Sequence, residues 1–155
     1  MCHDYNHLRP KDVEGRRNII LELLGSVKGN FLIEQPFLCD YGYNIHIGDN
    51  FYANHNLVIL DEAPVKFGDN VFIAPNCGFY TAGHPIDAAE RNKGLEYARP
   101  ITVGSDVWIG ANVCVMPGVT IGDDCVIGAG SVVVKDIPPH SVAVGNPCKV
   151  IKSIK

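Results

Sequence analysis

One histidine of this 155-residue chain lies in a sequence context suited to proton transfer. His84 stands between Gly83 and Pro85. Gly83 permits an unusual backbone conformation, and Pro85 restricts His84 to an extended one. Because the imidazole pKa lies near neutral pH, a rigidly held histidine is a candidate general base. On spacing alone, a histidine that merely closes a loop stays an open alternative.

The other histidines and the cysteines do not predict a metal site. A zinc site needs ligands that cluster on adjacent elements. His46, His55 and His84 are instead nine and twenty-nine residues apart, which disfavours a metal-dependent hydratase. The six cysteines are scattered and contain no C-x-x-C pair, so we expect free thiols and a reducing, cytoplasmic environment.

The composition favours short strands and turns over helices. The chain has 17 Val and 15 Ile against 9 Leu, together with 16 Gly and 10 Pro. Since β-branched residues pack well on pleated surfaces, we expect an all-β fold. A net charge of -4 argues against general nucleic-acid binding. The chain has no apolar run near the roughly 20 residues of a membrane span, and residues 1–7 do not resemble a signal peptide.

A period of six residues dominates the chain from Ile47 onward. Such a period is typical of a parallel β-helix, in which three hexads close a triangular coil of about eighteen residues. Gly and Asn would supply the positive φ angles of its corners. Two extra residues near Val65 and Lys66 predict a bulged corner. The aliphatic positions fall in three registers: Ile47, Ala53, Ile59 and Val65; Phe67, Ile73 and Phe79; and Val103, Ile109, Val115, Ile121, Ile127 and Val133.

Two segments depart from the repeat. Residues 10–25 predict one helix, with Pro10 near its start, Gly25 at its end, and a buried face formed by Val13, the stem of Arg17, Ile20, Leu21 and Leu24. We therefore divide the chain into an N-terminal helical segment, 1–29, and a β-helix domain, 30–155. Residues 82–100 are polar and lack the repeat. A long loop extruded from a rigid solenoid is usually functional, and His84 lies near the start of this one.

Four motifs resemble one family closely. They are Asp40-Tyr-Gly-Tyr-Asn through Asn54, Thr-Ala-Gly-His84-Pro, Ile-Thr-Val-Gly-Ser-Asp-Val-Trp108, and Lys135-Asp-Ile-Pro-Pro together with Gly145-Asn-Pro-Cys-Lys149. The chain is similar in these motifs to the maltose and galactoside O-acetyltransferases, which are hexapeptide-repeat acetyltransferases. The resemblance implies a left-handed parallel β-helix and a homotrimer with active sites at the subunit interfaces. It also implies acetyl transfer from acetyl-CoA to a sugar hydroxyl, without a metal.

The resemblance further implies roles for individual residues. His84 matches the general base, Asn54 a position near the thioester, and Trp108 an aromatic beside the pantetheine arm. Asp40 and Glu62 match acceptor-side positions. The remaining coenzyme positions match Ala111, Ala129, Val134, Lys135, Lys149 and Lys152. Because the last two are Lys where relatives often carry Arg, phosphate binding would lack a bidentate fork.

The acceptor itself stays open at this point. Relatives carry a further N-terminal segment that helps to cover the acceptor pocket, so we expect the short N-terminus to affect sugar specificity. An antibiotic or amino acid is the alternative acceptor, since relatives with those acceptors share the fold and the coenzyme groove. A catalytically idle trimeric scaffold is the non-enzymatic alternative.

Overall fold

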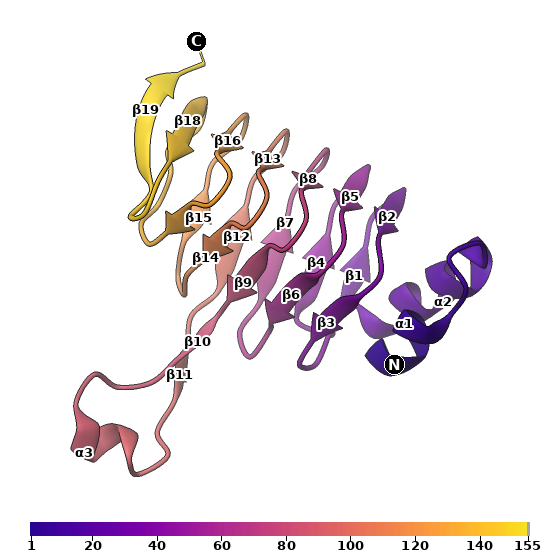
Figure 1. Cartoon of the computed structure of the whole chain (residues 1–155), viewed down its shortest axis with the longest axis horizontal. Helices are drawn as coiled ribbons and strands as arrows, with labels where there is room; N and C mark the ends of the chain where they lie inside the picture. Colours follow the sequence, from indigo (N-terminus) through magenta and orange to yellow (C-terminus); the bar gives the residue numbers. More distant parts are fainter. Residues whose placement is uncertain (155) are drawn as a thin grey trace.

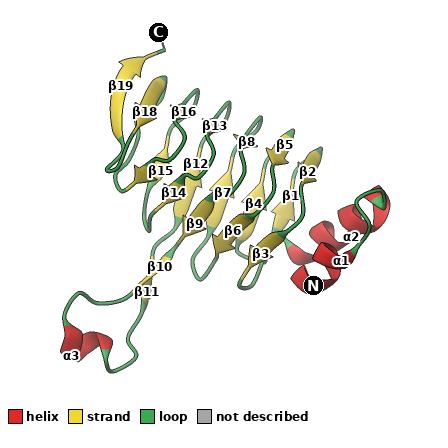
Figure 2. Ribbon diagram, in the orientation of Figure 1, coloured by secondary structure: helices red, strands yellow, loops and turns green. Residues whose placement is uncertain are grey.

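The computed structural model describes residues 1–154, which form a β-solenoid preceded by two helices (Figures 1 and 2). Three sheets run along its axis. The first contains β1 (Ser26–Val27), β4 (Ile45–Ile47), β7 (Val65–Phe67), β12 (Ile101–Val103) and β15 (Thr120–Ile121). The second contains β2 (Phe31–Ile33), β5 (Phe51–Ala53), β8 (Phe72–Ile73), β13 (Trp108–Ile109), β16 (Val126–Ile127), β18 (Ser141–Val144) and β19 (Lys149–Ser153). The third contains β3 (Phe37–Cys39), β6 (Leu57–Leu60), β9 (Gly78–Tyr80), β14 (Cys114–Val115) and β17 (Val132–Val133).

Each coil of the solenoid contributes one strand to each sheet, and successive coils pair in parallel. Coils 1 to 5 comprise β1–β3, β4–β6, β7–β9, β12–β14 and β15–β17, and a sixth coil begins at Ile137, which bridges to Ile121, and continues into β18. The final strand, β19, folds back antiparallel to β18. The predicted parallel β-helix is therefore confirmed. Because backbone hydrogen bonds run between coils, each coil is stable only against its neighbours.

The apolar residues of the three sequence registers fill the interior. All thirteen are buried, and none has a relative exposure above 5%. Each packs above its counterpart in the next coil, as Ile109 does between Ile73 and Ile127. Phe51, Phe67 and Phe79 stack edge to face in the wider coils, with ring centroids 5.0–5.2 Å apart. The predicted inward-pointing positions are thus confirmed for each of these residues.

The tight corners use asparagine and aspartate more than glycine. Asn50, Asn70 and Asp106 all have positive φ at the corner between the first and second sheets. Their side chains form a ladder, since the Asn50 amide donates to Asn70 and the Asn70 amide donates to Asp106, each at 2.9 Å. Short polar side chains tolerate this conformation and bond locally, which explains why the corners repeat so regularly.

The bulged corner lies slightly before its predicted place. Val65 and Lys66 are regularly paired with Ile45 and His46, so they are not bulged. The pairing interval is twenty residues in the early coils and eighteen between Thr102 and Thr120. The extra residues belong to residues 61–64, between β6 and β7, and the preceding coil is widened in the same way at residues 40–44. The hexad pattern could place the two extra residues only approximately, because corner residues do not point into the interior and so do not follow the six-residue repeat.

The single predicted helix is wrong in its bounds. Residues 1–25 contain two helices instead of one, α1 (Cys2–His7) and α2 (Val13–Leu23). Asp12 caps α2 by accepting a hydrogen bond from the Gly15 N–H at 3.0 Å, so Pro10 precedes the helix. Gly25 follows its end and serves close packing, because a Cβ there would lie 2.0 Å from the Tyr43 carbonyl oxygen. The division at residues 29 and 30 stays a prediction.

The predicted buried face of the helix is also partly wrong. Val13 is 67% exposed, and Arg17 and Leu21 are exposed too. The buried residues of α2 are Arg16, Ile20 and Leu23.

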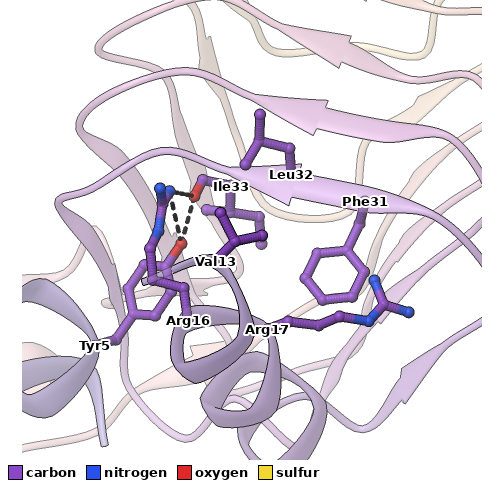
Figure 3. Close-up of a pocket in the computed structure, with 7 residues that line it drawn as sticks. All are labelled: Tyr5, Val13, Arg16, Arg17, Phe31, Leu32 and Ile33. Atoms are coloured by element: carbon purple, nitrogen blue, oxygen red, sulfur yellow. Dashed lines mark hydrogen bonds between the residues drawn. The ribbon is translucent and has the colours of Figure 1, made fainter. Parts of the chain in front are cut away.

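The burial of Arg16 explains why another face of α2 is turned inward, and Figure 3 shows its contacts with Tyr5 and Ile33. Its guanidinium donates to the Ile33 carbonyl at 2.6 Å and to Glu34 at 2.9 Å, beside the Tyr5 hydroxyl. A paired arginine thus takes a core position that an apolar residue was expected to fill.

The extruded loop is confirmed and has its own structure. It leaves coil 3 through β10 (Ala82–Gly83) and returns through β11 (Tyr97–Ala98), which pair antiparallel. The short helix α3 (Ala88–Arg91) lies at its far end, well away from the solenoid (Figure 1). Among the described residues, the longest helix has 11 residues, too few to cross a bilayer.

Candidate functional site

The predicted site residues lie in two separate regions of one chain. Asp40, Glu62 and His84 lie where the chain passes from the third sheet to the first, which we call the loop edge: residues 40–44, 61–64, 81–100, 116–119 and 134–136. The outer side of the second sheet and its adjoining corner, which we call the second-sheet face, carry Asn54, Trp108 and four of the other predicted coenzyme residues: Ala111, Ala129, Lys149 and Lys152. One chain does not bring the two regions together.

The loop edge is enlarged in three successive coils, which gathers its acidic residues. Residues 40–44 widen coil 1, residues 61–64 widen coil 2, and the extruded loop departs from coil 3. Asp40 and Glu62 therefore occupy neighbouring coils, with Thr81 beside them. The Thr81 hydroxyl is buried, donates to the Leu60 carbonyl at 2.7 Å and lies 3.4 Å from Glu62 Oε2. This arrangement supports the prediction that Asp40 and Glu62 act at one site.

Electrostatics at the loop edge favour a shared proton. Partial burial raises the pKa of Asp40 to about 6, and the adjacent Glu62 carboxylate adds to the rise. Asp61 and Glu96 contribute further negative charge. When two carboxyl groups approach closely, one is more easily protonated, and such a pair can donate and accept hydrogen bonds at the same time. A ligand with neighbouring hydroxyl groups fits this chemistry.

The ring of His84 is oriented by its own loop. Nδ1 lies 3.1 Å from the Leu95 carbonyl oxygen. Because a carbonyl only accepts, this contact places a proton on Nδ1 and leaves the lone pair on Nε2. Nε2 lies 3.9 Å from Glu96 Oε1, and the side chain is 56% exposed. The ring is thus held in the tautomer that a base at Nε2 requires.

Sequence reasoning missed two acidic residues at this edge. Glu96 lies near His84 although it comes twelve positions later, because the β10–β11 pairing folds the loop back on itself. Asp61 is 0% exposed and accepts hydrogen bonds from the backbone of residues 40–42. Neither residue carries a local sequence signal, since each acts on a segment distant along the chain.

The second-sheet face carries an outward column of apolar and aromatic side chains. Trp108 pairs with Phe72 on one side and Val126 on the other. The column ends at a cation, Lys152. In order, its members are Leu32, Tyr52, Phe72, Trp108, Val126, Val142 and Lys152.

A parallel column of small residues lies beside it. Backbone hydrogen bonds place Asn54, Ala74, Gly110 and Gly128 in successive coils, followed by Val144 and its partner Lys149. Asn54 and Ala74 line a surface hollow together with Tyr52, Phe72, Ile73 and Trp108. Ala111 and Ala129 follow Gly110 and Gly128 at the adjoining corner. These small residues leave room for a narrow chain to lie against the backbone.

Each of the two columns ends at a lysine on the C-terminal strand β19. Lys149 and Lys152 are both exposed on β19. Five strand steps at about 4.8 Å separate Asn54 from Lys149, which makes about 24 Å. The face therefore offers an amide at one end, an apolar wall in the middle and two cations at the other end.

Val134 and Lys135 lie elsewhere in the same chain. They follow β17 on the loop edge, two coils beyond Thr81. In one chain they do not contact the second-sheet face. Among residues 1–154, no three His, Cys, Asp or Glu side chains gather closely enough to hold a metal ion.

Comparisons with known proteins agree with this geometry. The family model described as bacterial transferase hexapeptide (six repeats) matches residues 100–135. A Saccharomyces cerevisiae protein provisionally named an acetyltransferase is 64% identical over 152 residues, which are 98% of this chain and 78% of that protein. Galactoside O-acetyltransferase of Escherichia coli K12 is 51% identical over 154 residues, covering 99% of this chain and 76% of that protein.

Solved structures match the whole described fold. Galactoside acetyltransferase in complex with coenzyme A superposes with a TM-score of 0.98 at 51% identity, over 99% of this chain and 77% of that one. A maltose O-acetyltransferase from Clostridium difficile 630 superposes equally well at 54% identity, over 99% of this chain and 82% of that one. With relatives this similar over most of their length, the chain belongs to the galactoside and maltose O-acetyltransferase family of hexapeptide-repeat acetyltransferases.

Proposed function

We propose that this protein transfers an acetyl group from acetyl-CoA directly to a hydroxyl of a sugar-like acceptor. The acceptor binds at Asp40 and Glu62, His84 is the general base, and the coenzyme lies along the second-sheet face. The related galactoside acetyltransferase was solved with coenzyme A, and a related Vibrio cholerae acetyltransferase was solved with acetyl-CoA. Both relatives support the choice of cosubstrate.

The single observation behind the proposal is that both regions present their chemistry in the same order along the solenoid axis. On the loop edge, Asp40, Glu62 and His84 occupy coils 1 to 3, and Val134 and Lys135 occupy coil 5. The second-sheet face presents Asn54 in coil 2 and Trp108 in coil 4, and its lysines lie in β19.

Two copies of the chain with parallel axes would therefore form one groove from these regions. An acceptor would sit at one end of the groove, the thioester near coils 2 and 3, and phosphates at the lysine end.

The proton transfer follows from the orientation of the His84 ring. Nε2 takes the proton of the acceptor hydroxyl while that oxygen attacks the thioester carbonyl carbon. A new C–O bond forms, the C–S bond breaks, and CoA leaves as a thiolate that takes up the proton from Nε2. The Leu95 carbonyl fixes Nδ1–H throughout, and Glu96 stabilises the imidazolium that forms. A base of this type contributes about 10²- to 10⁴-fold to the rate.

Asn54 has the position and chemistry for the thioester. Its Oδ1 accepts the His55 N–H at 2.7 Å, which fixes the amide and leaves its NH₂ group available as a donor. A donor aimed at the developing oxyanion stabilises the transition state more than the ground state. We therefore propose that the Asn54 amide donates a hydrogen bond to the thioester carbonyl. In this arrangement Asn54 lies between His84 of a neighbouring copy and Trp108 of the same copy.

The outer surfaces of the solenoid support a closed homotrimer. The second-sheet face is apolar, and the third sheet also presents apolar residues outward: Leu38, Val58, Gly78, Cys114 and Val132. By contrast, the first sheet presents Ser26, His46, Lys66, Thr102 and Thr120.

Two apolar faces on a three-sided prism allow each copy to pack its second face on the third face of the next. Such a heterologous contact closes into a ring. The exposed Ile86 and Tyr97 on the extruded loop fit the same arrangement, in which the loop lies on a neighbouring copy.

The cysteines support a proposal for the cellular location. All six cysteines are free thiols, which is typical of proteins from reducing compartments. We accordingly place the enzyme in the cytoplasm.

A CoA-release assay on the His84→Ala variant tests the function. Acetyl-CoA is supplied with maltose, galactose, an aminoglycoside or an amino acid, and free thiol is measured. We expect turnover with a hydroxyl acceptor and a loss of at least about a hundredfold in kcat for His84→Ala. His46→Ala, on the polar first sheet, is the matched control and should retain full activity. Turnover of His84→Ala within a fewfold of the parent would refute the assigned base, and CoA binding without turnover of any acceptor would favour the scaffold.

A further inference from the structure

The most completely bonded carboxylate at the loop edge belongs to a residue that the proposed reaction does not use. Asp61 is 0% exposed, and its carboxylate accepts three consecutive backbone N–H groups, from Asp40 at 3.1 Å, Tyr41 at 2.9 Å and Gly42 at 2.7 Å. Its own carbonyl accepts the Asn44 amide at 2.7 Å. Three successive amides around one carboxylate form an anion-binding nest, supplied here by the chain itself.

Within residues 1–154, this three-amide nest lies at a widened corner, whereas Asp136 at the unwidened corner of coil 5 accepts the Thr120 N–H at 2.7 Å. The corresponding residue of coil 3 is the neutral Thr81, and the regular corner at residues 116–119 contains no acidic residue. Gly42 has a φ of +84°, and a Cβ there would lie 2.7 Å from the Leu23 carbonyl oxygen. The widened corner therefore packs closely against α2. The backbone of residues 40–42 is therefore fixed by Asp61 from one side and by α2 from the other.

The result of this bonding is the placement of one functional side chain. Asp40 begins the widened corner, and its N–H is one of the three that Asp61 holds. Glu62 directly follows Asp61, so the same few atoms fix both members of the acceptor pair. A shift of the corner would separate the two carboxyl groups, whereas the coenzyme columns lie on the second sheet and do not include this corner.

We propose that Asp61 is a positioning residue for acceptor recognition, which holds the Asp40 carboxyl beside Glu62 so that the pair binds two neighbouring hydroxyls of the acceptor. The inference rests on the proposed function for its substrate and on the hydrogen bonds above for its geometry. Asp61 does not touch the acceptor, because it is buried and its carboxylate oxygens are engaged by the backbone.

The first test is Asp61→Asn, which keeps the size of the side chain but places an NH₂ group against at least one backbone N–H. With a hydroxyl acceptor from the CoA-release panel as probe, we expect KM for that acceptor to rise about tenfold or more. KM for acetyl-CoA should change less than twofold. Asp123→Asn is the matched control, because Asp123 Oδ1 accepts the Ser105 N–H at 2.7 Å at a corner remote from the acceptor pair. An unchanged acceptor KM in Asp61→Asn would overturn the proposal.

A double-mutant cycle separates positioning from general destabilisation. If Asp61 acts through Asp40, then Asp61→Asn should add less than twofold to acceptor KM in an Asp40→Asn background. A purely structural role predicts that the two effects multiply, which would overturn the proposal. Should Asp61→Asn fail to fold, Asn44→Ala removes one hydrogen bond to the same residue. That variant should raise acceptor KM at least threefold, and no change would count against the proposal.

A further measurement remains informative if no acceptor in the panel is turned over. The Asp40 carboxyl is titrated by ¹³C NMR in the parent and in Asp61→Asn. Loss of Asp61 removes a neighbouring negative charge and frees Asp40 from Glu62, so the midpoint should move to lower pH by at least half a unit. An unmoved midpoint would overturn the positioning role, whereas a moved midpoint without turnover would overturn only the proposed function.

Discussion

Phe72 and Trp108 lie side by side on adjacent parallel strands, and both aromatic side chains point out of the solenoid. They pair directly in the β8–β13 ladder and are 43% and 58% exposed. Large aromatic side chains rarely face water in neighbouring positions without a partner, so this pair marks the middle of the proposed coenzyme groove.

The first prediction uses the fact that Trp108 is the only tryptophan of the chain. Coenzyme A should change the intrinsic fluorescence saturably, because its pantetheine arm covers the indole. Trp108→Ala should weaken coenzyme binding about tenfold, equivalent to about 1.4 kcal/mol, with thermal stability changed little, since the side chain is exposed. Thr102→Ala, on the outward side of the first sheet, serves as control. Calorimetric binding of CoA without any fluorescence change would place the coenzyme elsewhere.

The second prediction concerns the division of the site between two chains. His84→Ala and Asn54→Ala should each be nearly inactive alone. The two variants are unfolded, mixed equally and refolded together. A site is then complete only if its His84 comes from an Asn54→Ala chain and its Asn54 comes from a His84→Ala chain. Random assembly in a trimer then restores about a quarter of the parent activity. Variants mixed without subunit exchange are the control, and a mixture that stays inactive after verified exchange would mean that each site lies within one chain.

The third prediction is a pH dependence of stability from Asp40. Partial desolvation and the neighbouring Glu62 raise the pKa of Asp40 from 3.8 to about 6. The folded chain therefore binds this proton more tightly than the unfolded chain does, and the resulting stabilisation, complete below about pH 4, is lost as pH rises through about 6. Asp40→Asn removes the charge, so its melting temperature relative to the parent should be higher at pH 7.5 than at pH 4.5. Calorimetry at both pH values decides, and an equal difference at both would contradict the assignment.

The fourth prediction concerns the thiols of Cys2 and Cys39, whose sulfur atoms lie 3.4 Å apart. The hydrogen bond from Cys39 lowers the pKa of Cys2 to about 6, so Cys2 is mostly a thiolate at neutral pH. Oxidised glutathione should accept two electrons from the pair and leave one intramolecular disulfide between α1 and β3. Peptide mass mapping detects the link, which should raise the free energy of unfolding by about 4 kcal/mol, as the loop-entropy relation gives for a loop of this length. Cys2→Ser should prevent it and Cys114→Ser should not, and a Cys39 that stays alkylatable after oxidation would refute the pairing.

The sequence predicted those features that are encoded within a single hexad or a single loop. Ile109 was predicted to point into the interior because turn-forming residues adjoin it in its hexad, and this pattern can be recognised within a single hexad. His84 could be singled out because Gly83 and Pro85 adjoin it. The start of the extruded loop was visible for the same reason, since the repeat stops there.

The sequence was less informative wherever distant segments meet. The face of α2 was misassigned because Arg16 is paired by Tyr5 and Glu34, which lie on other elements. Asp61 was overlooked because the amides it holds belong to residues about twenty positions earlier. In both cases a polar group is stable in the interior only through partners that the linear pattern does not show.

By itself, then, the sequence determined the interior of the solenoid, the family and most candidate residues, because a short repeat fixes which side chains point inward. Only the tertiary structure decided how those candidates are distributed. The triangular coils place Asn54 on the second-sheet face and His84 on the loop edge of the same chain, while parallel stacking aligns Asn54, Trp108 and the terminal lysines along one face. The same stacking sets Asp61 against Asp40, since parallel pairing brings together residues one coil apart.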